Sequence, residues 1–253
     1  MRVQVAGSRM ELGKTAAGHI AMALRARLRE QEQVRIIFAA APSQSEMLAA
    51  LIQEPEIDWP RVTAFHMDEY LGLPEDAPQR FAHWLRRAFA DHVPLGRFET
   101  IDPGDSPHLT CDRYAKLLGK APIDLVLLGV GTNGHLAFND PPANLEDPDV
   151  VKVVTLDRMC REQQVLDGCF EAFDDVPDQA ITLTVPALLA GHELFCCVPG
   201  QHKSTAVQAM LESPVSGECP ATALRNHPRC TLYLDLDSSS KSPYHALFND
   251  HRS

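Results

Sequence analysis

A histidine stands in a glycine-rich turn directly after an apolar run at residues 123–131. The run has the length and β-branched content of a buried parallel strand, and Gly131 and Gly134 shape the turn that leads to His135. Ligands of open α/β sheets bind outside the carboxyl ends of the strands. Asp140 follows shortly after and could orient the imidazole, which exchanges protons near neutral pH. The pattern predicts a proton-transfer site.

Two adjacent acids, Asp68 and Glu69, follow a second strand-like run at residues 62–67. Carboxylates are rarely buried without a purpose, and one held in a partly desolvated cleft could move a proton on and off carbon. A helix cap or a salt bridge is the alternative interpretation, and these residues alone do not decide between the two.

Groups that could bind an anion follow two other strand-like runs. Residues 39–45 lead from a strand into a helix, where free N–H groups and the Ser43 hydroxyl could hold a phosphate. With Glu46 three residues later, Ser43 also fits a capping box, and on this segment alone capping is the favoured interpretation. Lys203 follows a Pro-Gly turn near the start of a helix, a position that disfavours a cation unless an anion binds there. Lys203 and Arg161 are therefore phosphate-binding candidates, with a solvated surface lysine as the alternative.

The elements that must position these residues alternate along the chain. Strands are expected at residues 34–41, 62–67, 123–131, 151–155, 192–198 and 230–234. Helices are expected at about residues 12–31, 44–53, 79–91, 108–118, 201–212 and 220–226. This alternation predicts a three-layer, Rossmann-like α/β fold whose mostly parallel central sheet is flanked by helices on both faces. No linker or repeat divides the chain, so a single domain is expected over residues 1–237, with a flexible tail at 238–253.

Composition excludes several classes of protein. The net charge of −11 over 253 residues argues against a nucleic-acid binder. Neither a signal peptide nor an apolar run that could cross a bilayer is evident, which predicts a cytoplasmic protein without a membrane partner. The seven cysteines show no CxxC pair or Cys/His metal spacing, so reduced, buried thiols and no metal are expected. Without a Walker loop or dinucleotide fingerprint, no cofactor is expected either.

Together these segments resemble the glucosamine-6-phosphate deaminase/isomerase family, a relative of 6-phosphogluconolactonase. The resemblance depends on Met67-Asp-Glu-Tyr70 combined with Gly131-Thr-Asn-Gly-His-Leu-Ala-Phe-Asn-Asp-Pro141. The lactonase branch also has an acidic pair and a Gly-His loop. The stretch Leu136-Ala-Phe-Asn-Asp-Pro141 follows the deaminase loop more closely, and the likeness extends from the first strand to about Asp237.

The resemblance implies conversion of glucosamine 6-phosphate into fructose 6-phosphate and ammonia. Asp68 aligns with the base that moves a proton between C2 and C1, and His135 aligns with the residue that opens the sugar ring. Asp140 occupies the position of a supporting Glu, and Asn133 occupies that of a second acid. The substrate-binding residues are then expected to be Ser43, Ser45, Glu69, Gly131, Gly134, Arg161 and Lys203.

Three departures from the family pattern suggest a divergent branch. Asn133 cannot carry the charge of an acid, so either ring opening is slower or Asp140 supports His135 alone. The shorter Asp140 also changes the reach to that ring. The usual Gly/Thr-rich phosphate loop is replaced by Ala40-Ala-Pro-Ser-Gln44, which shifts phosphate binding toward serine hydroxyls and cations.

Other functions remain open at this point. One is a 6-phosphogluconolactonase-like hydrolase or another sugar-phosphate isomerase on the same fold, and the other is a non-catalytic sugar-phosphate sensor. In every case the expected partner is a small sugar phosphate, and homo-oligomer formation is left open.

Overall fold

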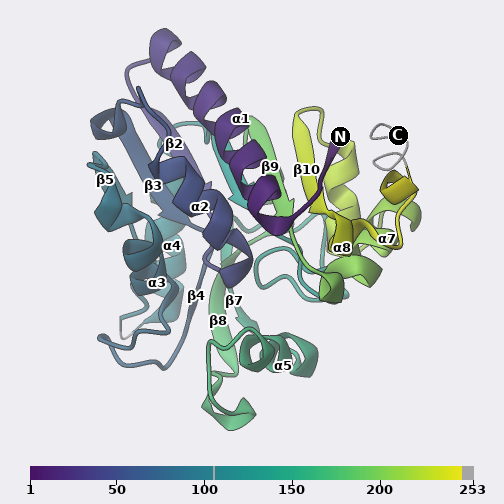
Figure 1. Ribbon diagram of the computed structural model, residues 1–253. Coiled ribbons are helices and arrows are strands. Elements are labelled where there is room, and N and C mark those ends of the chain that lie inside the picture. Colours follow the sequence, from purple (N-terminus) through teal and green to yellow (C-terminus); the bar gives the residue numbers. More distant parts are fainter. Residues whose placement is uncertain (105, 247–253) are drawn as a thin grey trace.

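The computed structural model describes residues 1–104 and 106–246, and its centre is a seven-stranded sheet (Figure 1). Every neighbouring pair of strands in this sheet is parallel. In spatial order the strands are β1 (Arg2–Ala6), β10 (Cys230–Asp235), β9 (Glu193–Val198), β6 (Leu125–Leu128), β2 (Val34–Phe38), β3 (Val62–His66) and β5 (Arg97–Glu99).

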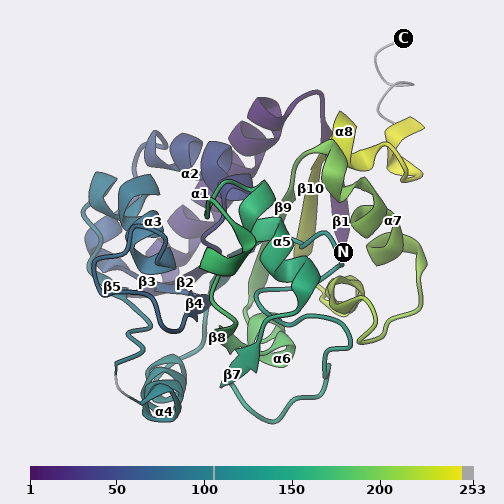
Figure 2. The same ribbon diagram turned by 90° about the horizontal axis from the view of Figure 1, so that it is seen from below.

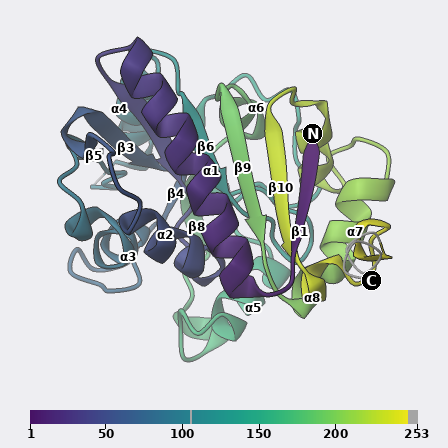
Figure 3. The same cartoon turned by 45° about the horizontal axis from the view of Figure 1, so that its top comes forward.

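Helices cover both faces of the sheet because its central strands are apolar on both sides. In β2, Ile36 and Phe38 join one buried cluster while Ile37, between them, joins the other. The first cluster includes residues of α1 (Arg9–Glu30), α2 (Ser45–Ile52) and α3 (Phe81–Ala88). The second includes residues of α4 (Pro107–Leu118), α6 (Val185–Leu189) and α7 (Ser204–Glu212). Figure 3 shows α1 crossing the face of the sheet, and the expected three layers are confirmed.

A second, three-stranded sheet lies below the first and is antiparallel. It contains β4 (Asp68–Tyr70), β8 (Gln179–Leu183) and β7 (Val151–Thr155), with α5 (Arg158–Leu166) between β7 and β8 in the chain (Figure 2). The strand expected at residues 151–155 is present, but it belongs to this small sheet and not to the main parallel one. Only Val151 of that strand is buried, which is typical of an antiparallel sheet with one solvated side.

The chain reverses its direction of travel across the main sheet next to β2. It passes from β2 to β3 and β5 on one side and then returns to place β6 on the other side. The carboxyl ends of β2 and β6 therefore flank a topological switch point, where open α/β sheets form their ligand crevice.

Short elements complete the fold. Helix α8 (Leu236–Ser239) follows β10 and buries Ser238 and Ser239, so the packed chain continues beyond the expected boundary at 237. Of the expected tail 238–253, residues 247–253 lie outside the described residues. The 3₁₀ helices are Pro42–Gln44, Trp59–Arg61, Ala90–His92, Phe173–Asp175, Gln201–Lys203 and Pro220–Asn226, the last of which was expected as an α-helix. Over the described residues, no helix has both the length and the apolar character needed to cross a membrane.

Candidate active site

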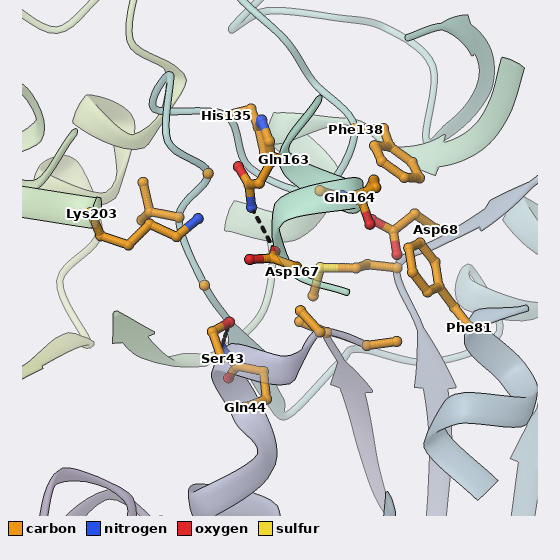
Figure 4. Close-up of a pocket in the computed structure, with 18 residues that line it drawn as sticks. Ser43, Gln44, Asp68, Phe81, His135, Phe138, Gln163, Gln164, Asp167 and Lys203 are labelled. Carbon is orange, nitrogen blue, oxygen red and sulfur yellow. Dashed lines mark hydrogen bonds between the residues drawn. The ribbon is translucent and has the colours of Figure 1, made fainter. Parts of the chain in front are cut away.

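A cavity opens at the switch point, between the carboxyl ends of the parallel strands and helix α5 (Figure 4). Its empty volume is about 560 Å³, which suits a small-molecule ligand. Five of the residues expected at the site line it: Ser43, Asp68, Gly131, His135 and Lys203. They come from four separate segments, so the fold brings together parts of the chain that are far apart in the sequence. In Figure 4, Lys203 and Asp68 lie on opposite sides of the cavity.

Asp68 is the first residue of β4 and pairs with Thr182 of β8. It is 7% exposed, and within the described part of the chain its carboxylate accepts no hydrogen bond. Burial, assisted by the nearby charge of Glu69, raises the pKa of Asp68 well above its ordinary value. A desolvated carboxylate that faces a cavity without a partner is suited to act as a base.

Glu69 points away from the cavity and holds the start of helix α3. Its carboxylate accepts the N–H groups of Phe81 at 2.9 Å, Ala82 at 3.1 Å and Tyr70 at 3.0 Å. Burial raises the pKa of Glu69 even though these bonds favour its charged form. The sequence left a proton-transfer role and a helix-cap role open for this acid. In the structure Glu69 caps the start of α3 and does not line the cavity.

His135 is buried above the cavity with Asp140 behind it, and its Nδ1 lies 3.1 Å from the Asp140 Oδ1. Asn133 connects the two, since its Nδ2 donates to Asp140 at 3.1 Å and its Oδ1 accepts the His135 N–H at 3.0 Å. Burial raises the pKa of Asp140, but contacts with His135 and Asn133 and the N–H of Asp157 outweigh it, so the pKa lies below its ordinary value. Asp140 therefore stays ionised beside the imidazole.

The glycines of the turn make room for this arrangement. A Cβ added to Gly131 would lie 2.2 Å from two ring atoms of His135, so only glycine lets the imidazole lie in its place. Gly134 has a φ of +87° and lies against Cys219, away from the cavity lining. Gly131 touches the cavity, whereas Gly134 shapes the turn.

Ser43 and Lys203 line the side of the cavity opposite Asp68. The capping box expected for Ser43 was wrong, because α2 has Gln44 as its N-cap and no side-chain cap. Ser43 instead lies in a 3₁₀ turn, where its Oγ accepts a hydrogen bond from the Gln44 Nε2 at 3.1 Å. Lys203 is 3% exposed, and burial lowers its pKa to about 8. Ser45 begins α2 and does not line the cavity.

Arg161 does not reach the cavity in this structure. Its guanidinium donates to the carbonyl oxygens of Val176 at 2.7 Å and Phe173 at 3.1 Å and stacks on the Phe173 ring. Gln163 and Gln164 of the same helix, and Asp167 at its C-cap, point toward the cavity instead.

These three side chains were not expected at the site. Gln163 accepts from Thr132 N–H at 2.9 Å and donates to Asp167 at 3.2 Å, and Gln164 accepts the Tyr70 hydroxyl at 2.7 Å. Helix α5 is thus bonded to both the histidine turn and the strand that carries Asp68. An N-capping Asp at 157 was the available signal for this helix.

A buried base, an imidazole–carboxylate pair and a cation around one cavity suit proton transfer on a small anionic molecule. A family model described as glucosamine-6-phosphate isomerases/6-phosphogluconolactonase matches residues 7–233. The chain belongs to this family. The two catalytic candidates that the family resemblance pairs, Asp68 and His135, both lie at the cavity.

Curated members of the family resemble the chain over most of its length. A glucosamine-6-phosphate deaminase of Halothermothrix orenii is 30% identical over 245 residues, which cover 95% of this chain and 99% of that protein. One from Streptomyces avermitilis is 34% identical over 200 residues, 78% of this chain and 76% of that protein.

Solved structures of the family share the fold. A monomeric glucosamine-6-phosphate deaminase superposes with a TM-score of 0.88 at 27% identity, covering 95% of this chain and all of that one. A 6-phosphogluconolactonase of Trypanosoma brucei gives a TM-score of 0.79 at 17% identity, covering 95% of this chain and 98% of that one. The second likeness concerns the fold alone.

Proposed function

We propose that this family member is an amino-sugar-phosphate deaminase/isomerase that converts glucosamine 6-phosphate into fructose 6-phosphate and ammonia. The observation that carries the proposal is the buried Asp68 carboxylate, which faces the cavity without a hydrogen-bond partner among the described residues. An aldose–ketose isomerisation needs such a base beside C2. Relatives named glucosamine-6-phosphate deaminase support the choice of substrate.

The reaction begins with ring opening, for which His135 is the proton carrier. It transfers a proton to the ring oxygen as the C1–O5 bond breaks and the C1 hydroxyl loses its proton, which leaves an open-chain aldehyde. Asp140, held ionised, stabilises the imidazolium form of His135. Asn133 fixes the geometry of both groups.

Asp68 then removes the C2 proton, and the electron pair forms the C1–C2 double bond of an enolamine while the C1 carbonyl oxygen takes back a proton to become a hydroxyl. Return of a proton to C1 gives an imine at C2. Addition of water to that imine and departure of ammonia leave the C2 ketone of fructose 6-phosphate. A carboxylate with a raised pKa suits both proton removal from C2 and proton return to C1, since neither its charged nor its protonated form is strongly favoured.

Lys203 and Ser43 bind the phosphate in this proposal, across the cavity from Asp68. Anchoring the sugar at both ends makes the proton transfer effectively intramolecular. Because Arg161 is engaged by carbonyl oxygens of its own segment, Lys203 is the principal cation at the phosphate.

The proposal is tested by measuring ammonia and fructose 6-phosphate released from glucosamine 6-phosphate, with galactosamine 6-phosphate alongside. Asp68→Asn should abolish turnover but retain substrate binding, and Lys203→Ala should mainly raise KM. Hydrolysis of 6-phosphogluconolactone without ammonia release would instead support a lactonase. Binding of both sugar phosphates without turnover of any substrate would support a sensor.

A cytoplasmic location remains a prediction of the sequence.

A further inference from the structure

Three potential metal ligands from separate segments meet beside the cavity. They are an imidazole nitrogen of His135, a carboxylate oxygen of Asp140 and the thiol of Cys160 in α5, and all three atoms lie within 4.8 Å of one another. We propose that they form an inhibitory binding site for a thiophilic divalent cation such as Zn²⁺. Binding of the ion depends on ligand chemistry alone, whereas its inhibitory effect rests on the proposed function of His135 in ring opening.

Burial distinguishes this group from a chance surface cluster. His135 is 8% exposed and Cys160 is 1% exposed. The His135 Nδ1 is inaccessible to water, and its one polar neighbour among the described residues is the Asp140 Oδ1 at 3.1 Å. A metal ion bound here would be coordinated by both groups and would satisfy the buried nitrogen.

The donor set favours zinc-like ions over Mg²⁺ or Ca²⁺. Sulfur and imidazole are soft or intermediate ligands, and three protein ligands leave one position of a tetrahedron for water. Outer hydrogen bonds already orient the group: Asn133 and the N–H of Asp157 donate to Asp140, and the N–H of Cys160 donates to Asp157 at 2.6 Å.

Such an ion would occupy the atoms that ring opening needs. Metal bound to Nδ1 would separate His135 from Asp140, and coordination by Cys160 would join α5 to the histidine turn. Inhibition should therefore affect ring opening.

The test is titration of the full-length protein with Co²⁺, a spectroscopic substitute for Zn²⁺, followed by competition with Zn²⁺. We expect one equivalent to produce a thiolate-to-cobalt charge-transfer band that Zn²⁺ removes. Cys160→Ser should eliminate the band, and the matched control Cys169→Ser, which changes the half-buried cysteine nearby, should retain it. His135→Gln provides a second variant with the thiol intact, and it should weaken binding about tenfold or more.

Two results would overturn the proposal. The wild-type protein could show no charge-transfer band with Co²⁺, or the band could persist in Cys160→Ser. Thermal unfolding of each variant checks its folding. If Cys160→Ser fails to fold, the His135→Gln titration decides, because unchanged affinity there would also refute the site.

Discussion

Adjacent acids of the same chemistry have opposite surroundings in this protein. Asp68 faces a cavity without a hydrogen-bond partner in the described chain, whereas Glu69 is surrounded by three backbone N–H donors. The alternation of side chains along β4 separates them, since successive residues of a strand point to opposite faces. Position on the strand therefore decides which carboxylate can act as a base.

The pH dependence of kcat/KM should be bell-shaped, with limbs set by Asp68 and Lys203. Burial raises the pKa of Asp68, so the base becomes active only above the ordinary range of an aspartate, and activity rises with pH there. Burial lowers the pKa of Lys203 to about 8, so the ammonium and the phosphate affinity are lost as pH rises through that value. A pH profile measures both limbs. A flat profile between pH 7 and about 10 would contradict the role of Lys203.

Asp167 places a negative charge beside Lys203 and should weaken phosphate binding. At a pH well below 8, where Lys203 stays protonated, Asp167→Asn should lower KM roughly three- to fivefold, as expected for one partly screened charge. It should also move the basic limb to lower pH, because Asp167 raises the pKa of Lys203. Steady-state kinetics measure both effects, with the exposed Asp174→Asn as the control. An increase in KM would show that Asp167 itself binds substrate.

Gly131→Ala should displace the imidazole, because the new Cβ would lie 2.2 Å from its ring atoms. We expect kcat to fall about a hundredfold, as for a catalytic group moved by about 1 Å. Gly18→Ala is the matched control, because its Cβ has room on helix α1. Wild-type kcat in Gly131→Ala would refute the placement of His135.

At the scale of elements, helices α5 and α3 and the small antiparallel sheet complete the site at the edge of the main sheet. Helix α5 covers the cavity and bonds to the histidine turn through Gln163 and to β4 through Gln164. Helix α3 begins at the Glu69 carboxylate, which fixes the position of Phe81 in the cavity wall. The small antiparallel sheet thus connects three parts of the site: Asp68, the Glu69 carboxylate at the start of α3, and helix α5.

Glu69→Gln should destabilise the fold, because an amide NH₂ cannot accept the N–H groups that the second carboxylate oxygen receives. We expect a loss of about 1–3 kcal/mol in the free energy of unfolding. Urea unfolding measures it, and Glu75→Gln, at an exposed position before α3, should change stability by less than about 0.5 kcal/mol. Equal stability of the two variants would show that the cap contributes little.

At the scale of the whole molecule, the sequence predicted the parallel sheet and its covering layers because apolar runs such as 34–38 are buried on both faces. It also predicted which loops meet, since carboxyl ends of parallel strands share one edge. It could not predict Gln163 and Asp167 at the cavity, because α5 buries the polar side chains Gln163 and Gln164 and was not among the expected helices. Nor could it show that Arg161 binds carbonyl oxygens of its own segment, which depends on how residues 173–176 fold back.

The measurement that tests the central claim most directly is the fate of deuterium in a single turnover of glucosamine 6-phosphate labelled at C2. With Asp68 as the only base, deuterium should leave C2, and some of it should reappear at C1 of fructose 6-phosphate. Asp68→Asn should open the ring but retain the label at C2. Equal loss of the label in the variant, or complete retention by the wild-type protein, would contradict the account.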